Sequence, residues 1–392
     1  MVPNLRFPIF HFDWNENYFG NICTIRSGIG FKADEYVEQG VPLLKIDNVG
    51  YGNIKWNNIS YLPETYLKQY PFLKLNENDI VLALNRPITN NQLKISKLTS
   101  KDIPSILYQR VGKINVSSDY NLDYIYYLLT KNVFDFVLKT SIGSDQPFIS
   151  TENLKKLIMK VPTITEQQKI GHFLSLIDQR IQTQIKIIEL KQSLIKDIED
   201  RILWKTTNTQ TKPIREFLTE INNKSIIQNQ YPLLSSTKKG LFLQTDYFNK
   251  EAASSNNIGY KIVHKGDIII SPQNLWMGNI TYNDKFDNGL VSPSYRIYKV
   301  KEEYNAFYIS RILMSYRALS LYKNISEQGA SIVRRNLNVD AFNELCFPIP
   351  NIKKQDEVGL FLSKLHQELK CETWILMQLK SQKNYLLNNM FI

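Results

Sequence analysis

The chain has 392 residues and a mass of 45.8 kDa, more than one ordinary domain needs, which predicts about two to four compact units. Its 48 Lys and Arg residues against 37 Asp and Glu give a net charge of +11, which favours polyanionic partners without proving nucleic-acid binding. Because the sequence shows neither a signal-peptide pattern nor an apolar run long enough for a membrane helix, we expect a cytoplasmic globular protein without a membrane span.

The first globular region extends to about residue 160 and mixes two hydrophobic periods. Short apolar runs such as PLLKI from Pro42 and DIVLAL from Asp79 lie between Gly, Asn and Pro turns and predict strands. The segment from Leu122 to Lys139 has helical spacing instead. The region is therefore predicted to be α+β.

A long helix follows Pro162. We expect it to begin near Thr165 and Glu166, with the threonine as its cap, and no proline interrupts the sequence until Pro213. Apolar residues recur at heptad spacing, as in one strand of a coiled coil, with polar Gln184 and Lys191 at two a positions. Polar residues at such positions can fix the register and orientation of a helix pair.

The second half of the chain repeats the first. VPTITEQQKIGHFLSLID, from Val161, returns as IPNIKKQDEVGLFLSKLH, from Ile349, at an offset of 188 residues. Asp79 matches Asp267 at the same offset, and PLLKIDNVG matches PLLSSTKKG at an offset of 190. The segment 304–322 has helical spacing in the second globular region. Three landmarks in one order predict an internal duplication.

A second long helix is predicted from about Gln355 to the C-terminus, with Glu372 and Lys383 as polar exceptions in its seam. We expect the two long helices to pair antiparallel as a coiled coil with a pseudo-twofold axis; the alternative is a separate helical core in each domain. The predicted divisions are 1–160, 161–207, 208–348 and 349–392. The predicted helix-pairing residues are Ile170, Leu174, Ile177, Ile181, Ile188, Ile195, Ile202, Val358, Leu362, Leu365, Leu369, Leu376, Leu379 and Leu386.

These features resemble the specificity subunits of type I restriction-modification systems. The resemblance is carried by the opening VPNLRFPIF, by the stretch GASIVRRNL from Gly329, and by the junction motif at Pro162, Glu166, Gln167, Ile170, Leu174 and Asp178. The second copy of the junction departs from the pattern, with Lys354 in place of the acid and Val358 in place of the isoleucine. The helix cap or its packing is therefore expected to differ there.

The resemblance implies two target recognition domains, each reading one half of a split DNA sequence, with the helices setting the unread gap. It also implies two methylation subunits that use S-adenosylmethionine and two motor-nuclease subunits that use ATP and Mg. No cofactor is expected in this chain. The implied roles of the complete assembly are sequence-specific methylation and phage defence.

Catalytic motifs are missing from the sequence, as a recognition subunit requires. There is no Pro-Pro pair for an adenine methyltransferase loop and no phosphate-binding G-x-x-x-x-G-K-S/T. Two E-x-K triplets, at Glu189 and Glu368, fall in the heptad helices and are interpreted as solvated charges. The four histidines lack metal-ligand spacing, and Cys23, Cys346 and Cys371 form no C-x-x-C pair. No catalytic and no metal-binding residue is predicted.

Recognition chemistry remains, because Arg and Lys read guanine, Asn and Gln read adenine, and hydroxyl and cationic side chains hold phosphates. An ordinary solvated loop is the alternative for each residue, and an adaptor without sequence preference or an enzyme with an unfamiliar motif are the alternatives for the chain. The predicted DNA-binding residues are Lys45, Asn48, Asn85, Arg86, Asn90, Asn91, Gln92, Lys94, Ser235, Thr237, Lys238, Lys239, Gln273, Asn274, Arg334, Arg335 and Asn336.

Overall fold

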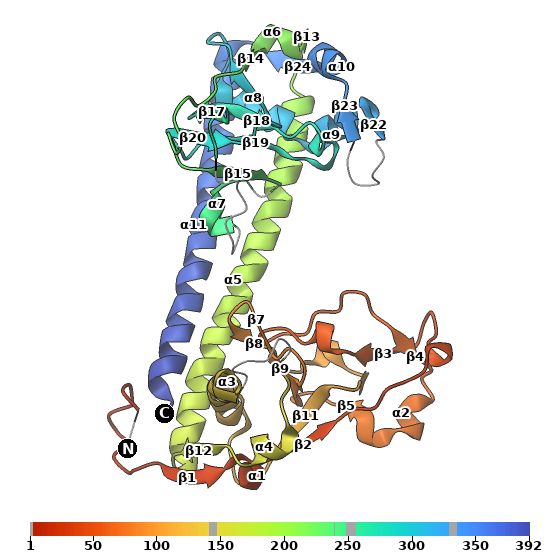
Figure 1. The fold of residues 1–392 in the computed structure, drawn as a ribbon, viewed down its shortest axis with the longest axis vertical. Helices are drawn as coiled ribbons and strands as arrows, with labels where there is room; N and C mark the ends of the chain where they lie inside the picture. Colours follow the sequence, from red (N-terminus) through yellow and green to blue (C-terminus); the bar gives the residue numbers. More distant parts are fainter. Residues whose placement is uncertain (1–2, 141–146, 239, 248–255, 329–334) are drawn as a thin grey trace. The chain divides into compact units, whose positions relative to one another are not determined.

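The computed structural model describes residues 3–140, 147–238, 240–247, 256–328 and 335–392 (Figure 1). The chain divides into two compact units, residues 1–184 with 375–392 and residues 185–374. Each unit contains part of both long helices, α5 (Ile164–Trp204) and α11 (Ile352–Met390). The four-segment division made from the sequence stays a prediction. Lys239, Arg334 and most of the stretch 329–337 lie outside the described residues.

Unit 1 is built on an antiparallel sheet in the order β2-β11-β6-β9. Strand β6 is buried on both faces: Ile80 and Leu82 join the core that contains α3, whereas Val81 and Ala83 join a second core. Two buried faces explain why the residues that follow Asp79, IVLAL, are continuously apolar. The sheet strands are β2 (Cys23–Ser27), β6 (Ile80–Ala83), β9 (Ile95–Lys97) and β11 (Val111–Val116).

The remaining elements of unit 1 surround the two cores. The predicted strands at PLLKI and DIVLAL are confirmed as β3 and β6, and the predicted helix from Leu122 to Lys139 is confirmed as α3. A second sheet has the order β4-β3-β10-β5, while β1 pairs with β12 and β7 with β8. These elements are α1 (Phe19–Ile22), α2 (Tyr66–Gln69), α3 (Leu122–Thr140), α4 (Thr151–Lys155), β1 (Asn15–Tyr18), β3 (Val41–Leu44), β4 (Tyr61–Leu62), β5 (Lys74–Leu75), β7 (Ile88–Thr89), β8 (Gln92–Leu93), β10 (Ser105–Leu107) and β12 (Ile158–Val161).

Unit 2 repeats this plan with a sheet in the order β14-β21-β18-β19. Strand β18 is again shared between two cores, with Ile268 and Ile270 in one and Ile269 in the other. Asp267 accepts a hydrogen bond from the backbone of His264 in the turn before β18, as Asp79 does from Asn76 before β6. The predicted duplication is confirmed in the folded structure. The strands are β14 (Leu218–Ile221), β18 (Ile268–Ile270), β19 (Ile280–Tyr282) and β21 (Arg296–Val300).

The helix predicted over 304–322 is two helices, because Ser315 ends one and caps the next. Its hydroxyl donates to Ile312 O at 2.7 Å and accepts from Ala318 N at 3.4 Å. The other elements of unit 2 are α6 (Ile214–Phe217), α7 (Gln244–Tyr247), α8 (Ala306–Leu313), α9 (Tyr316–Asn324), α10 (Val339–Glu344), β13 (Thr209–Pro213), β15 (Leu234–Thr237), β16 (Gly240–Leu243), β17 (Lys261–His264), β20 (Asn288–Val291), β22 (Ser326–Gln328), β23 (Arg335–Leu337) and β24 (Cys346–Pro350).

A buried glutamine in each copy of the junction motif joins the long helix to its globular frame. In unit 1, Gln167 donates to Pro162 O at 2.9 Å and accepts from Asn121 N at 3.0 Å. In unit 2, Gln355 makes the same two bonds, to Pro350 O at 2.8 Å and from Asn305 N at 3.0 Å. The repeated glutamine therefore fixes the angle at which the chain leaves the frame and enters the helix.

The glycine one turn later is required by the same junction. A Cβ at Gly171 would lie 2.6 Å from Asn121 Oδ1 and 2.7 Å from Tyr124 N. The predicted cap at Thr165 is wrong, because α5 begins at Ile164 and places this residue inside the first turn. The repeated motif therefore forms the junction between the frame and the long helix, and it is not a capping box.

Replacing Gln167 with leucine is expected to lower the free energy of unfolding of unit 1 by about 2–4 kcal/mol, since it leaves the half-buried N–H of Asn121 and the buried carbonyl of Pro162 unpaired. Hydrogen exchange of peptides from α3, followed in the full chain, measures this change. Gln168→Leu is the matched control, because this neighbouring side chain is exposed and should change stability by less than about 0.5 kcal/mol. Equal effects of the two substitutions would contradict the assigned role.

The two long helices pack antiparallel within each unit. In unit 2, Lys191 Nζ lies 2.8 Å from Glu372 Oε1, and Glu199 Oε1 lies 2.8 Å from His366 Nε2, so residue numbers rise on α5 as they fall on α11. In unit 1, Lys383 Nζ lies 2.6 Å from Asp178 Oδ1. Three polar exceptions in the heptads, Lys191, Glu372 and Lys383, thus meet partners on the opposite helix.

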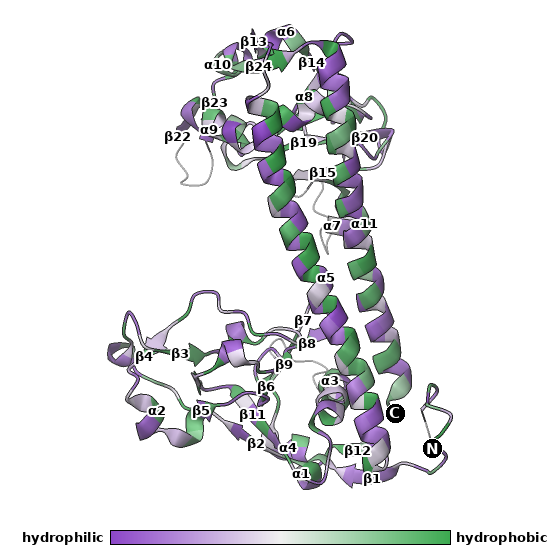
Figure 2. Cartoon of the chain, turned by 180° about the vertical axis from the view of Figure 1, so that it is seen from behind, coloured by the Kyte–Doolittle hydropathy of each residue, from purple (hydrophilic) through white to green (hydrophobic). Residues whose placement is uncertain are grey.

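The apolar seam accounts for the rest of the helix pairing. Apolar and polar residues alternate along both helices (Figure 2), and each predicted pairing residue is buried or half-buried. The outer parts of the helices also serve the globular cores: Ile170 and Leu386 join that of unit 1, and Val358 and Leu203 that of unit 2. The pseudo-twofold axis stays a prediction.

Candidate DNA interface

The β7-β8 hairpin presents the exposed amides of unit 1. Asn90 and Asn91 have φ values of +52° and +56°, as the two central residues of a type I′ turn require, and asparagine is one of the few residues that tolerate them. Asn90 Nδ2 donates to the Tyr51 hydroxyl at 3.3 Å, and this hydroxyl lies 2.6 Å from Thr89 Oγ1. The hairpin is therefore held against a second loop while Asn90, Asn91 and Gln92 stay exposed.

The base of the hairpin adds one exposed cation. Arg86 is exposed, and its backbone N–H donates to Pro147 O at 2.9 Å. Lys94 is half-buried and its backbone N–H donates to Pro87 O at 2.7 Å. Asn85 is half-buried, and its Oδ1 has no hydrogen-bond partner among the described residues. Of these three predicted residues, Arg86 offers its charged group to solvent most fully.

The predicted DNA-binding residues near β3 make hydrogen bonds that stabilise their own loop. Asn48 is 3% exposed; its Oδ1 accepts from Lys45 N and its Nδ2 donates to Lys55 O, each at 2.9 Å. Lys45 donates to Ser60 and lies 5.5 Å from the Tyr36 ring centre. Because the amide of Asn48 is committed to its own loop, we remove Asn48 from the candidate set.

The β15-β16 hairpin occupies the matching position in unit 2 but presents different chemistry. Ser235 is buried, and the Thr237 hydroxyl donates to Gly240 O at 3.1 Å. Lys238 is exposed at the end of the hairpin. We therefore remove Ser235 from the candidate set and retain Lys238 as a cation of this loop.

A second cluster in unit 2 joins residues about 60 positions apart in the sequence. Arg335 N donates to Gln273 O at 3.2 Å, which ties β23 to the loop after β18. The Arg335 guanidinium lies 4.7 Å from the Trp276 ring centre, a cation–π contact. Gln273 and Asn336 are exposed beside it, while Asn274 is half-buried and donates to Ser271 Oγ at 3.4 Å.

Tyr51, Lys55 and Trp276 are the members of these clusters that sequence reasoning missed. Lys55 Nζ lies 5.3 Å from the Tyr51 ring centre, which adds a cation beside the Asn90 amide. An aromatic residue in a polar loop is the signal that could have found them. Cations and amides held on aromatic rings are suited to phosphates and base edges, since little side-chain freedom is lost on binding.

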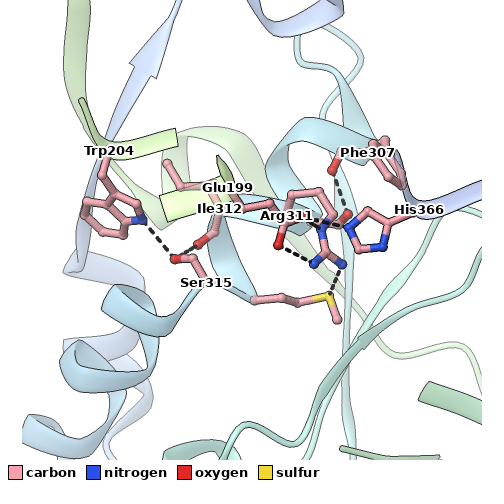
Figure 3. A network of polar contacts seen from close by, with 9 residues as sticks. Glu199, Trp204, Phe307, Arg311, Ile312, Ser315 and His366 are labelled. Atoms are coloured by element: carbon pink, nitrogen blue, oxygen red, sulfur yellow. Dashed lines mark hydrogen bonds and ion pairs between the residues drawn. The ribbon is translucent and has the colours of Figure 1, made fainter. Parts of the chain in front are cut away.

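A buried ion-pair network fixes the frame of unit 2 to both long helices. Arg311, on α8, donates to the two carboxylate oxygens of Glu199 at 2.6 and 2.9 Å, and His366, on α11, lies 2.8 Å from the same group (Figure 3). Burial opposes ionisation of Glu199, but the bonds from His366 and Arg311 outweigh it and lower the pKa of the carboxyl below 4.5. Trp204 Nε1 donates to Ser315 Oγ at 2.9 Å, a contact drawn in the same figure.

The globular frame and α5 of unit 1 have a recognised family pattern. Residues 13–192 match the family described as the type I restriction modification DNA specificity domain. These residues belong to that family. Specificity subunits of this family are non-catalytic in general. Among the described residues, none of the helices combines the length and apolar character needed to cross a membrane.

Two known proteins are similar to part of this chain. The chain is 42% identical over 193 residues to the type I restriction enzyme MjaVIII specificity subunit of Methanocaldococcus jannaschii, covering 49% of this chain and 45% of that protein. It is 29% identical over 175 residues to the EcoAI specificity subunit of Escherichia coli, covering 44% and 29%. The matched segment therefore spans less than half of each of these relatives.

The fold of the chain is similar to that of a solved S subunit. The crystal structure of the type I restriction-modification system S subunit from M. genitalium aligns with 100% of this chain and 99% of its own, at a TM-score of 0.57 and 16% identity. This similarity extends the fold assignment to unit 2, which lies largely outside the family match. The predicted fold class, mixed domains joined to two long helices, is confirmed.

Proposed function

We propose that the chain is the DNA sequence-recognition subunit of a type I restriction-modification complex, with one half of a split target read by each unit. The observation that carries the proposal is that two copies of one frame present different exposed side chains. Unit 1 offers Arg86 and the Asn90–Gln92 amides, whereas unit 2 offers Lys238 and, around the half-buried Arg335, Gln273 and Asn336. Different base-reading groups on a common frame suit two unlike half-sites.

The chain is proposed to carry no catalysis of its own. We expect two methylation subunits to use S-adenosylmethionine and two restriction subunits to use ATP and Mg, all in the cytoplasm. The long helices would set the unread gap and give the partner subunits a scaffold. The family match in residues 13–192 supports this assignment of roles.

Selection from a pool of random duplexes, with the full chain and its methylation partner, tests the proposal. The expected result is enrichment of two short sequences at a fixed separation. An adaptor whose helices only join other proteins would enrich no sequence, so this outcome would favour the alternative function.

Arg335→Ala is expected to weaken discrimination at one half-site by about 1–3 kcal/mol, and Arg86→Ala at the other, if each guanidinium contacts a base. Each variant is the control for its counterpart, because the frames are equivalent and the targets are not. Competition binding with duplexes altered in a single half-site measures the effect. Equal losses at both halves would count against the residue assignment, and unchanged hydrogen exchange in unit 2 would exclude misfolding of the Arg335 variant.

A further inference from the structure

The segment before β1 folds over the start of α5 and the end of α11 in unit 1. Arg6 donates from Nε and Nη2 to the two carboxylate oxygens of Glu166, each at 2.7 Å, and that carboxylate is 1% exposed. The Phe7 ring packs edge-on against Phe173 with 5.7 Å between ring centres, and Leu5 N donates to Asn389 O at 2.9 Å. A cation and an aromatic in adjacent positions thus cover the helix ends of unit 1.

The matching place in unit 2 is an open groove of about 500 Å³. At the repeat offset of 188 residues, Phe361 stands for Phe173 and Lys354 stands for Glu166. Both residues line the groove, together with Arg201, which matches Asn389. Phe361 is 45% exposed, so the aromatic ring that Phe7 covers in unit 1 has an exposed counterpart in unit 2.

The connection into unit 2 is too short to supply an arm of its own. Fourteen residues precede β1 at Asn15, but four residues, Lys205 to Asn208, separate α5 from β13 at Thr209. Those four residues are used to pass from the helix into the strand, and Lys205 itself lines the groove. This connection therefore supplies no arm to the groove, and we look for an occupant in another polypeptide.

The charge of the groove selects the chemistry of that occupant. Arg201, Lys205 and Lys354 line it with a single acid, Glu357, which lies 3.3 Å from Lys354. The excess is positive, whereas the buried group under the arm in unit 1 is a carboxylate. The arm of a second copy would bring Arg6 against these cations and be repelled, so a carboxylate is the favoured counterpart.

We propose that this groove binds an extended segment of a partner protein in which an Asp or Glu precedes an aromatic residue. The aromatic side chain packs on Phe361, and the carboxylate lies among Arg201, Lys205 and Lys354. This binding mode is the intermolecular counterpart of the contact that the N-terminal segment makes within unit 1, with the charges of the ion pair reversed. This inference is independent of DNA recognition, because it uses none of the loop residues assigned to the target.

A synthetic pair of peptides tests the proposal. Both span residues 3–14, one with the natural sequence and one with Arg6→Glu, and both carry a fluorophore for anisotropy measurements against the full chain. We expect saturable binding of the reversed peptide with a Kd below about 1 mM, and at least tenfold weaker binding of the natural one. Lys354→Glu should invert this preference, and Phe361→Ala should weaken the reversed peptide at least tenfold.

Three results would overturn the proposal: no saturable binding of the reversed peptide, equal binding of both peptides, or binding unchanged by Lys354→Glu. Lys354 and Phe361 are both exposed, so these variants are expected to fold. The affinity of each variant for a random duplex is measured in parallel. A loss of duplex affinity without peptide binding would assign the groove to phosphate contacts and would also overturn the proposal.

Discussion

Replacing Arg311 with alanine is expected to lower the free energy of unfolding of unit 2 by about 3–5 kcal/mol, because it leaves the Glu199 carboxylate buried without its bidentate partner. Glu199 is 7% exposed, and His366 alone cannot satisfy both of its oxygens. Hydrogen exchange of peptides from α8, in the full chain, measures the loss locally.

Arg317→Ala is the matched control, since Arg317 also reaches from the frame to α5, where it lies 3.1 Å from Asp200. Its side chain is 42% exposed and that of Asp200 is 32% exposed, so the expected cost is below about 1 kcal/mol. Both variants remove an arginine that reaches from the frame of unit 2 to α5, from α8 in one case and from α9 in the other. Similar losses in both would contradict the assignment of the Glu199 site as the buried connection.

The destabilisation of the Arg311 variant is expected to depend on pH. The pKa of Glu199 is lowered in the folded chain, so its ionised form contributes stability above the ordinary value of 4.5, and this contribution is lost as the pH falls through the folded pKa. Loss of Arg311 removes part of the lowering. The difference in stability between the natural chain and the variant should therefore be largest near neutral pH and shrink below about pH 4.5. A difference that grew in acid would contradict the mechanism.

Replacing Arg6 with alanine is expected to destabilise unit 1 by about 3–5 kcal/mol, for the same physical reason. Within the described part of the chain, the Glu166 carboxylate would keep the Trp14 indole N–H, at 3.4 Å, as a side-chain donor. The Phe7 contact with Phe173 should loosen as well, because Arg6 holds the segment that carries it. Exchange protection of the first turns of α5 measures the loss.

The control for this variant is Lys155→Ala, which removes an exposed pair with Glu152 and should cost less than about 1 kcal/mol. A double variant, Arg6→Ala with Glu166→Gln, should recover part of the lost stability, because the uncompensated buried charge is removed. No recovery would mean that the segment is held by its apolar contacts and not by the ion pair.

The periodicity of apolar residues was sufficient to predict the helices and strands that bury one or both faces in a hydrophobic core. The runs at β3 and β6 and the spacing in α3, α5 and α11 all follow from which faces are buried. The prediction failed where one hydroxyl decided the outcome: Ser315 divides the segment 304–322 by capping a new helix, and periodicity does not register a cap within an apolar run.

Contacts between residues that lie far apart in the sequence could not be predicted from the sequence alone. Lys191 and Glu372 each looked like a defect in a separate heptad pattern, and the structure shows that they meet. Lys191 was also interpreted as a solvated charge of an E-x-K triplet, which is wrong, because it is half-buried and hydrogen-bonded to Glu372. Pairing the two exceptions fixes the register and the antiparallel direction of the helices within unit 2.

The candidate site was the least predictable part. Side-chain type alone could not separate Asn90, exposed on a hairpin, from Asn48, whose amide is enclosed by its own loop. The difference arises from hydrogen bonds within the folded loop, since Asn48 bonds backbone groups up to nine residues away. The same limit applied to Arg335, whose ring partner Trp276 comes from a distant loop.

Sequencing of methylated DNA from cells that carry this chain with its methylation partner tests the central claim most directly. The two units predict modified adenines in two short sequences separated by a fixed unread gap. Exchange of the unit 2 loops for those of a related chain should then change one half of the target and leave the other unchanged. A continuous methylated site, or methylation without sequence preference, would contradict the account.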